Sequence, residues 1–190
     1  MVDSFTQSGG TLSLAGGSIA GPFAITGGTF SLAGGTISGP VVISGGDVSW
    51  AGFGIGNGTA VTVEAGATLN LVGDAAKTIS GPVTNRGTIN WQGGPITVYG
   101  IPGGHAGEIR NEAGGLIDIQ CDQGLASVWE GPSAPLHNAG MLRKSAGTGT
   151  TDIGLALDNA GTVRCTLGQM RFSGGGSLLG ELLADASCSI

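Results

Sequence analysis

The sequence predicts an all-β protein, folded as a right-handed single-stranded parallel β-helix (β-solenoid) of about eight coils of 18–27 residues. Three observations predict it. Glycine supplies 40 of the 190 residues, about three times its usual share. The chain is 40% hydrophobic but only 11% charged, which suits short apolar strands joined by tight turns. The N-terminal third also repeats itself every 18 residues, as stacked repeat proteins do.

The composition excludes several other classes of protein. Glycine opposes helices, and disorder needs a lower hydrophobicity and a higher net charge than this chain has. Collagen needs abundant proline, but only 7 prolines are present. The net charge of −6 argues against binding to nucleic acid or to anionic membranes. The opening MVDSFTQSGG lacks a signal-peptide pattern, and no apolar run is long enough for a membrane helix.

The first coils can be seen directly as repeats. Residues 9–26 read GGTLSLAGGSIAGPFAIT, residues 27–44 read GGTFSLAGGTISGPVVIS, and residues 45–63 read GGDVSWAGFGIGNGTAVTV. Residues 67–84, ATLNLVGDAAKTISGPVT, continue the pattern with a small insertion. Each unit therefore corresponds to one coil of the solenoid.

Apolar and small polar residues alternate within each unit, as in strands with one buried face. In the first unit, Leu12 and Leu14 are expected to point inward, then Ile19 after a Gly-Gly corner, then Phe23 and Ile25 after Gly-Pro. Each unit thus contains three very short strands. The uneven spacing of the inward positions favours the right-handed form, because left-handed triangular solenoids prefer a strict six-residue repeat.

Stacked units align their inward residues into ladders. The first predicted inward ladder is Leu12, Phe30, Val48, Leu69, Ile89, Ile117, Leu142 and Val163. The second is Leu14, Leu32, Trp50, Leu71, Trp91 and Ile119, so both tryptophans are expected in the core. Each coil buries its apolar side chains only by lying on its neighbours.

The second half of the chain changes its corner residues. Four segments share an apolar–x–Asn–turn–Gly pattern, and their asparagines fall where Ile25 and Ile43 lie in the first coils. We expect a buried structural asparagine ladder of Asn85, Asn111, Asn138 and Asn159. The chain is then one β-solenoid segment, 1–190, of a longer protein. Regular coils of 18–21 residues occupy 1–84, and asparagine-ladder coils occupy 85–190, with loop insertions at 92–108 and 121–135.

The C-terminal residues and the cysteines give further expectations. By pattern, 174–190 aligns with 61–71, which places Cys188 at the Leu69 position. Cys121, Cys165 and Cys188 have no metal-ligand spacing, and their odd number does not indicate a disulfide framework. We therefore expect small buried apolar cysteines. Neither end carries a capping helix, so the solenoid continues in a longer chain or stacks end to end.

A resemblance follows from two of these segments. NAGMLRKSAGTGTT (138–151) and NAGTVRCTLGQMRFSGGG (159–176) resemble repeats of long secreted or surface-attached bacterial proteins, the autotransporter passengers and filamentous-haemagglutinin-like adhesins. The resemblance covers about residues 85–190, and the 18-residue coils resemble the same class more loosely. It implies a right-handed parallel β-helix, an extracellular setting, and a role in adhesion, matrix or surface display.

One outward ladder changes from hydroxyl to amide to charged side chains. Its members are Ser13, Ser31, Ser49, Asn70, Asn90, Asp118, Arg143 and Arg164. Polysaccharide lyases built on parallel β-helices place acidic and basic residues on such a face. A lyase-like cluster of Asp118, Arg143, Lys144 and Arg164 is therefore the enzymatic alternative, and a solvated face with a weak ion pair is the simpler interpretation.

The two insertions contain the other candidate binding residues: Tyr99, His105, Trp129 and Glu130. Inserted loops on neighbouring coils tend to lie close together, and exposed aromatic rings stack on sugars. A carbohydrate site there is one interpretation. The alternative is that Trp129 covers the open side of the solenoid.

A Thr-x-Ser row at Thr11/Ser13 and Thr29/Ser31 is interrupted by Asp47. Ice binding is one interpretation of this row, but a soluble outer strand face is the simpler one.

The sequence has no nucleophile–base motif, and we expect no cofactor and no metal site. We predict a non-enzymatic structural or adhesive rod segment of an extracellular or cell-surface bacterial protein. The partners predicted are a surface glycan, a host or matrix protein, or another copy end to end. The alternative is a carbohydrate-binding or polysaccharide-degrading β-helix.

Overall fold

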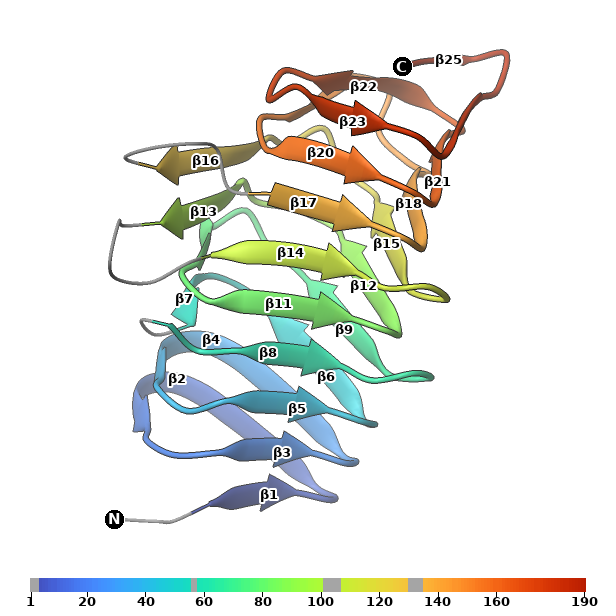
Figure 1. Cartoon of the computed structure of the whole chain (residues 1–190). Helices are drawn as coiled ribbons and strands as arrows, with labels where there is room; N and C mark the ends of the chain where they lie inside the picture. The colour runs from blue at the N-terminus through green and yellow to red at the C-terminus, as the bar shows by residue number, and fades with distance from the viewer. Residues whose placement is uncertain (1–3, 56–57, 101–106, 130–134) are drawn as a thin grey trace.

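The protein is a column of stacked coils, seen in a computed structural model that describes residues 4–55, 58–100, 107–129 and 135–190. All strand pairs are parallel, and the described residues contain no helix, hence none that could span a membrane. The chain climbs from β1 at the base to β25 at the top in about eight right-handed turns (Figure 1). The predicted fold class is confirmed.

The strands form three sheets, and from the third coil upward each turn passes through all three in order. The first sheet contains β1 (Phe5–Gln7), β3 (Phe23–Ile25), β5 (Val41–Ile43), β8 (Val61–Val63), β11 (Pro82–Asn85), β14 (Glu108–Asn111), β17 (Pro135–Asn138), β20 (Ala156–Asn159) and β23 (Gly176–Leu178). The second contains β2 (Thr11–Ile19), β4 (Thr29–Ile37), β6 (Asp47–Trp50), β9 (Thr68–Leu71), β12 (Thr88–Trp91), β15 (Leu116–Ile119), β18 (Met141–Lys144), β21 (Thr162–Cys165) and β24 (Glu181–Ala184). The third contains β7 (Phe53–Ile55), β10 (Lys77–Ile79), β13 (Ile96–Gly100), β16 (Leu125–Trp129), β19 (Thr150–Ile153), β22 (Gly168–Phe172) and β25 (Cys188–Ser189).

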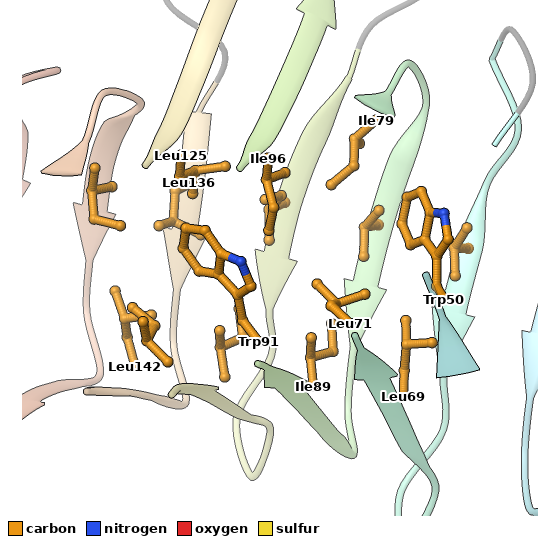
Figure 2. Close-up of a pocket in the computed structure, with 16 residues that line it drawn as sticks. Trp50, Leu69, Leu71, Ile79, Ile89, Trp91, Ile96, Leu125, Leu136 and Leu142 are labelled. Atoms are coloured by element: carbon orange, nitrogen blue, oxygen red, sulfur yellow. The ribbon is translucent and has the colours of Figure 1, made fainter. Parts of the chain in front are cut away.

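Both predicted inward ladders are present in register. Phe30 pairs with Leu12 below and Val48 above, and the same column continues through Leu142 to Val163. Trp50 and Trp91 are buried in the second ladder, as predicted, and point into the interior with the aliphatic residues around them (Figure 2). The apolar residues of neighbouring coils therefore form one continuous core.

The first two coils differ from the three-strand expectation. β2 and β4 are nine residues long and continue through the Ala-Gly-Gly bend without a break. Their pairing shifts register on both sides of Ala15, which is the mark of a β-bulge. Gly17 takes a φ of +77° at this bend, a conformation that glycine adopts without strain. A bulge therefore turns the strand where a corner was expected.

Glycine at the first corner, between the first and second sheets, is required by the coil beneath it. A Cβ atom on Gly27 would lie 2.6 Å from the carbonyl oxygen of Ser8, and one on Gly45 would lie 2.6 Å from that of Thr26. Such contacts are closer than atoms can approach without displacing the backbone. The high glycine content thus follows from the close stacking of coils as well as from turn conformation.

The asparagine ladder occupies this first corner, and its prediction is confirmed. Asn85 Nδ2 donates to Asn111 Oδ1 (2.8 Å), Asn111 Nδ2 to Asn138 Oδ1 (2.7 Å), and Asn138 Nδ2 to Asn159 Oδ1 (2.7 Å). The same Nδ2 atoms also approach the backbone carbonyls of the following coil, such as that of Met141, 3.0 Å from Asn111. All four side chains are buried, so these bonds satisfy polar groups that water cannot reach.

Gln7 in β1 performs the same task in the first coil, which the sequence pattern did not reveal. It shares the ladder position of Ile25 and the asparagines. Its buried side chain donates from Nε2 to the carbonyl of Gly9 (2.9 Å), with those of Gly10 and Thr29 slightly farther away. A longer amide thus satisfies the corner where no asparagine is present.

The second corner, between the second and third sheets, is also closed by inward side chains. Trp50 Nε1 donates to the carbonyl of Gly52 (3.0 Å), and Trp91 Nε1 to that of Gly94 (2.8 Å). In the coil between them, the buried Lys77 ammonium donates to three carbonyls, those of Gly93, Ala75 and Gly73 at 2.9, 3.0 and 3.2 Å. Burial holds the pKa of Lys77 below its usual value.

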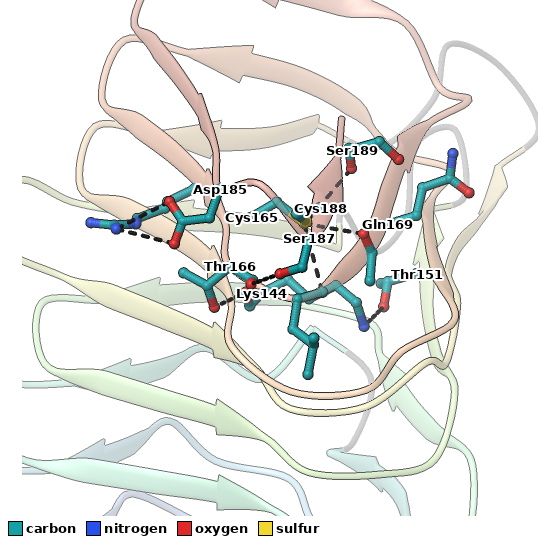
Figure 3. Close-up of a disulfide and its surroundings, with 12 residues drawn as sticks. Lys144, Thr151, Cys165, Thr166, Gln169, Asp185, Ser187, Cys188 and Ser189 are labelled. Carbon is teal, nitrogen blue, oxygen red and sulfur yellow. Dashed lines mark hydrogen bonds and ion pairs between the residues drawn. A yellow bond between two sulfur atoms is a disulfide. The ribbon is translucent and has the colours of Figure 1, made fainter.

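The last coil corrects two predictions. Leu182, not Cys188, continues the ladder of Leu69 and Val163, and Cys188 lies on the third sheet beside Gly168. Cys188 also forms a disulfide with Cys165 of the coil below, with Cα atoms 5.8 Å apart (Figure 3). The expectation of three unpaired cysteines was therefore wrong, and only Cys121 is free.

Replacing Asn111 by alanine tests the asparagine ladder. The variant removes the donor to Asn138 and the acceptor of Asn85, so buried polar groups lose their partners. We expect the free energy of unfolding, measured in urea, to fall by about 3 kcal/mol. Asn70→Ala, which removes a half-exposed amide on the outer face, is the matched control and should cost under about 1 kcal/mol. Equal losses would contradict a special role for the ladder.

Reduction of the disulfide tests how the last coil is held. The bond joins residues 23 positions apart, so its loss should destabilise the terminal coil by about 3 kcal/mol. Hydrogen exchange should accelerate in β24 and β25 when dithiothreitol is added to the wild type. A Cys165→Ala/Cys188→Ala variant should exchange at the faster rate with or without reductant, and Cys121→Ala should behave as the wild type.

Candidate functional site

The interior formed by the described residues is closely packed. Two cavities within it have volumes of about 40 and 20 Å³ and are lined almost wholly by apolar side chains such as Leu71, Ile89 and Leu136 (Figure 2). Binding pockets for small molecules are typically several hundred Å³ with a few polar groups. Any functional site in the described part of the chain therefore lies on the outer surface.

The outward ladder of the second sheet is in the predicted register along its whole length. Asn90 Nδ2 donates to Asn70 Oδ1 (2.9 Å), and Asn70 Nδ2 approaches Asp47 Oδ1 (3.4 Å). Above them, Asp118 pairs with Arg143, and Arg143 with Arg164, on successive strands. The structure thus brings three of the predicted site residues into one column.

Asp118 is the most enclosed group of this column. Its outward carboxylate is only 5% exposed, because Arg143 covers it with two hydrogen bonds of 2.9 Å and Gln120 donates a third of 2.9 Å. Burial by itself raises the pKa of Asp118, but hydrogen bonds from Arg143, Gln120 and Ser145 outweigh it and hold the pKa below its usual value. The carboxylate is ionised, and both of its oxygens accept hydrogen bonds from neighbouring side chains.

Lys144 is not part of this outward column, which corrects its place in the predicted cluster. It lies in the second inward ladder, in register with Ile119 and Cys165, and is fully buried. Its Nζ atom lies within hydrogen-bonding distance of four oxygens: Asp122 Oδ1 (2.7 Å), the carbonyls of Cys121 (2.9 Å) and Ala146 (3.0 Å), and Thr151 Oγ1 (3.1 Å). Figure 3 shows the ammonium group beside Thr151. Lys144 therefore closes the second corner from inside, as Lys77 does.

Arg164 completes the column with an ion pair to the terminal coil. Its Nη2 atom lies 3.2 and 3.3 Å from the two carboxylate oxygens of Asp185. Among the described side chains, its Nε is a buried nitrogen without a hydrogen-bond partner. Arg164 thus contacts Asp185, and not Asp118, although one strand separates it from that carboxylate.

The inserted segments bring together only part of the second predicted site. Tyr99 in β13 is 40% exposed and lies in register with Val128 in β16, which is 50% exposed. The backbone of Trp129 pairs with Gly100 one position further on. His105 and Glu130 lie outside the described residues. The sequence did not indicate Val128 as a candidate binding residue, because nothing in the pattern of an insertion shows whether a valine is buried or exposed.

A second polar cluster, not found from the sequence, lies on the outer side of the first sheet. His137 Nδ1 is 3.2 Å from Asp158 Oδ2 on the next strand, and Arg110 lies in register on the strand before. Arg110 binds Glu108 with two hydrogen bonds of 2.8 and 3.0 Å. These residues are far apart in sequence, so only the exact coil length of each insertion places them on one column.

The N-terminal Thr-x-Ser row also has the predicted register. Thr11 pairs with Thr29, which pairs with Asp47, and the serines align beside them. Near the other end, the first corner has a shallow groove of about 450 Å³ lined by glycines together with Leu116, Ala139, Met141 and Thr162. Neither surface holds a charged cluster.

The described residues contain no group of three or more histidine, cysteine, aspartate or glutamate side chains that could hold a metal ion. No family model matches the chain, and no curated protein or solved structure matches it significantly.

The ion pair of Asp118 predicts a pH dependence. Because the pKa of Asp118 is lowered in the folded state, its contribution to stability is present above its unfolded pKa of about 4 and is lost as the pH falls through the folded value. At pH 7, the free energy of unfolding of Asp118→Asn, measured in urea, should be about 1–2 kcal/mol lower than that of the wild type. This difference between variant and wild type should become smaller at about pH 3. A gap independent of pH would contradict the ion-pair assignment.

Proposed function

We propose that this chain is a non-enzymatic structural or adhesive rod segment of an extracellular or cell-surface bacterial protein. The main supporting observation is that its basic side chains are bonded to other groups of the same chain. All seven lysines and arginines already have partners within the chain. Five arginines form carboxylate pairs, such as Arg171 with Asp152 (2.7 Å) and Arg86 with Glu64 (3.1 Å), and both lysines are buried.

Most of these pairs join one coil to the next. Arg86, Arg143, Arg164 and Arg171 each contact a carboxylate 19–25 residues away, on an adjacent coil. The polar side chains of the faces and corners therefore add to the stacking along the axis. Surface pairs of this kind contribute little singly, but they repeat along the whole column. This arrangement suits a protein that must keep its length under load.

The disulfide supports an extracellular setting. Bonds such as Cys165–Cys188 persist in oxidising compartments and are rare in the cytosol. The setting agrees with the resemblance of residues 85–190 to secreted and surface-attached bacterial repeats. The mechanism is mechanical: about eight coils at about 4.8 Å each give a rod of about 40 Å that spaces or displays a surface.

The alternative, carbohydrate binding or degradation, is favoured by one specific observation. Tyr99 and Val128, one from each inserted segment, form an exposed apolar pair on which a sugar ring could stack. The enzymatic form of this alternative needs a carboxylate and a cation free to act on substrate. Asp118 and Arg143 instead form an ion pair with each other through two hydrogen bonds.

Small-angle X-ray scattering at low concentration, combined with a polysaccharide depolymerisation panel and a glycan array, tests the proposal. We expect a rod of about 40 Å and no depolymerisation. On the array, Tyr99→Ala and Trp129→Ala should test recognition by the inserted segments. A glycan bound by the wild type but by neither variant would favour an adhesive rod over a purely structural one.

Asp118→Ala serves as the test of the enzymatic alternative. Its matched control is Asp152→Ala, which removes a comparable pair with Arg171 on the third sheet. Polysaccharide turnover that is lost in Asp118→Ala but kept in Asp152→Ala would overturn the structural proposal. The absence of turnover in the wild type and in both variants would support it.

A further inference from the structure

Two arginines lie directly beside one another on neighbouring coils of the second sheet. Arg143 in β18 and Arg164 in β21 are in register on the outer face, on coils about 4.8 Å apart. Their acidic partners lie on the far sides, Asp118 in the coil below and Asp185 in the coil above. The order along the column is thus acid, base, base, acid. Like charges side by side repel one another, so this order does not help the coils to stack.

Arg164 is also incompletely bonded. Its Nη2 atom contacts Asp185 at 3.2 and 3.3 Å (Figure 3), whereas Arg143 holds Asp118 with both Nε and Nη2 at 2.9 Å. Among the described residues, nothing accepts a hydrogen bond from Arg164 Nε, although this atom is buried. A buried donor without a partner is costly, and a bound ion or ligand is one explanation for it in a native protein. The two side chains as a whole stay accessible, 35% exposed for Arg143 and 43% for Arg164.

An apolar strip runs beside these arginines. Two positions before each member of the charged column, the same strands carry Leu116, Met141 and Thr162 on their outer face. All three side chains are half-buried, and with the glycines of the first corner they line the groove of about 450 Å³. Glu181 lies above Thr162, with its Oε2 atom 3.4 Å from the hydroxyl, so the upper end of the groove is acidic. The lower part of the groove therefore offers apolar contact next to the guanidinium groups.

This surface belongs to the side of the column and does not depend on its ends. Strands β15, β18 and β21 are each paired with a strand on both sides (Figure 1). Further coils at either end would lengthen the column along its axis and leave this side face uncovered. The paired backbone also leaves no edge to which a peptide could add as a strand. A ligand here is therefore recognised by side chains.

The ligand that suits this surface carries an acidic group on a flat, partly apolar body. Arginine binds carboxylates and other oxyanions with paired hydrogen bonds, and it does so with geometric specificity. A pyranose ring presents a face of C–H groups, and the unbranched side chain of Met141 adapts its shape to such a face. An acidic polysaccharide combines the two features in each of its acidic sugars.

The net charge of −6 opposes an anionic ligand at long range. Salt screens charges more than about 8 Å apart at physiological ionic strength, so the nearest groups dominate. Next to the groove these are Arg143 and Arg164, and the carboxylates that offset them lie farther out in the column. Asp118, only 5% exposed, is covered by Arg143 as well. The local field therefore favours an anion between the two arginines.

We infer that Arg143, Arg164 and the apolar strip form a binding site for an acidic polysaccharide. The inference rests on the adhesive form of the proposed function and names the partner class of that function. The two arginines bind the carboxylate or sulfate group of the sugar, while Leu116 and Met141 contact its ring. Asp118 orients Arg143, and no bond of the polysaccharide is broken.

Isothermal titration calorimetry with four polymers tests the site. Polygalacturonate carries carboxylates, dextran sulfate carries sulfates, dextran is neutral, and polyglutamate is an acidic peptide. We expect one or both acidic polysaccharides to bind, polyglutamate to bind at least about tenfold more weakly, and dextran not to bind. The tighter of the two acidic polysaccharides identifies the acidic group, and its binding should weaken as salt is added.

Matched variants assign the binding to this site. Arg164→Gln should weaken it at least about tenfold, because charge-assisted hydrogen bonds are lost. Arg171→Gln is the control, since it removes an exposed arginine–carboxylate pair on the third sheet and should bind as the wild type does. Met141→Ser should weaken binding roughly fivefold, and Val42→Ser, at an exposed apolar position of the first sheet, should not. Circular dichroism checks folding, and Arg164→Lys, which keeps the charge but not the fork, replaces Arg164→Gln if that variant misfolds.

Three results would overturn this inference: no binding of either acidic polysaccharide, equally tight binding of polyglutamate, or equal losses in Arg164→Gln and Arg171→Gln. The last two would indicate attraction by charge alone. In each case, a rod of about 40 Å without polysaccharide turnover would leave the proposed function intact. Turnover that depends on Asp118 would instead overturn the proposed function, even if the binding is confirmed.

Discussion

The stacking of one coil on another is the constraint on which the rest of this structure depends. A single coil has too few residues to enclose its own apolar side chains, so burial comes from the coils above and below. Close stacking also brings backbone onto backbone. The carbonyl oxygen of Ser8 lies where a Cβ of Gly27 would be, and the same clash recurs at Gly45. Glycine is therefore abundant because the column leaves no room at its corners for anything larger.

Stacking creates a second demand, since turns inside a column have carbonyl groups that solvent cannot reach. The protein meets it with inward side chains that end in a donor. Asparagine amides serve the first corner, while the indoles of Trp50 and Trp91 and the ammonium groups of Lys77 and Lys144 serve the second. These residues have different chemistry and the same task. The core is thus apolar along its axis and polar at its edges.

Most of the fold could be predicted because alternation and period report directly on which side chains face inward. The ladders from Leu12 to Val163 and from Asn85 to Asn159 followed from spacing alone. Lys144 was misplaced because its charge was given more weight than its spacing, two residues after the inward Leu142. Cys188 was misplaced because the pattern of 174–190 was matched without fixing the corner before it.

The candidate site was less predictable, because contacts between coils depend on the lengths of insertions. Asp118 and Arg143 could be paired from the ladder, but the covering of Asp118 by Gln120 could not. His137 and Asp158 meet only because the coil between them has 21 residues. Exposure of Val128 depends on how β13 and β16 extend from the column, which no local pattern encodes.

The asparagine ladder has a direction. Each amide donates toward the C-terminal end, from Asn85 through Asn111 and Asn138 to Asn159, so the four side-chain dipoles add along the axis as peptide dipoles do in a helix. Aligned hydrogen bonds polarise one another, so each link strengthens the next. The column therefore carries an electrical polarity as well as a chain polarity.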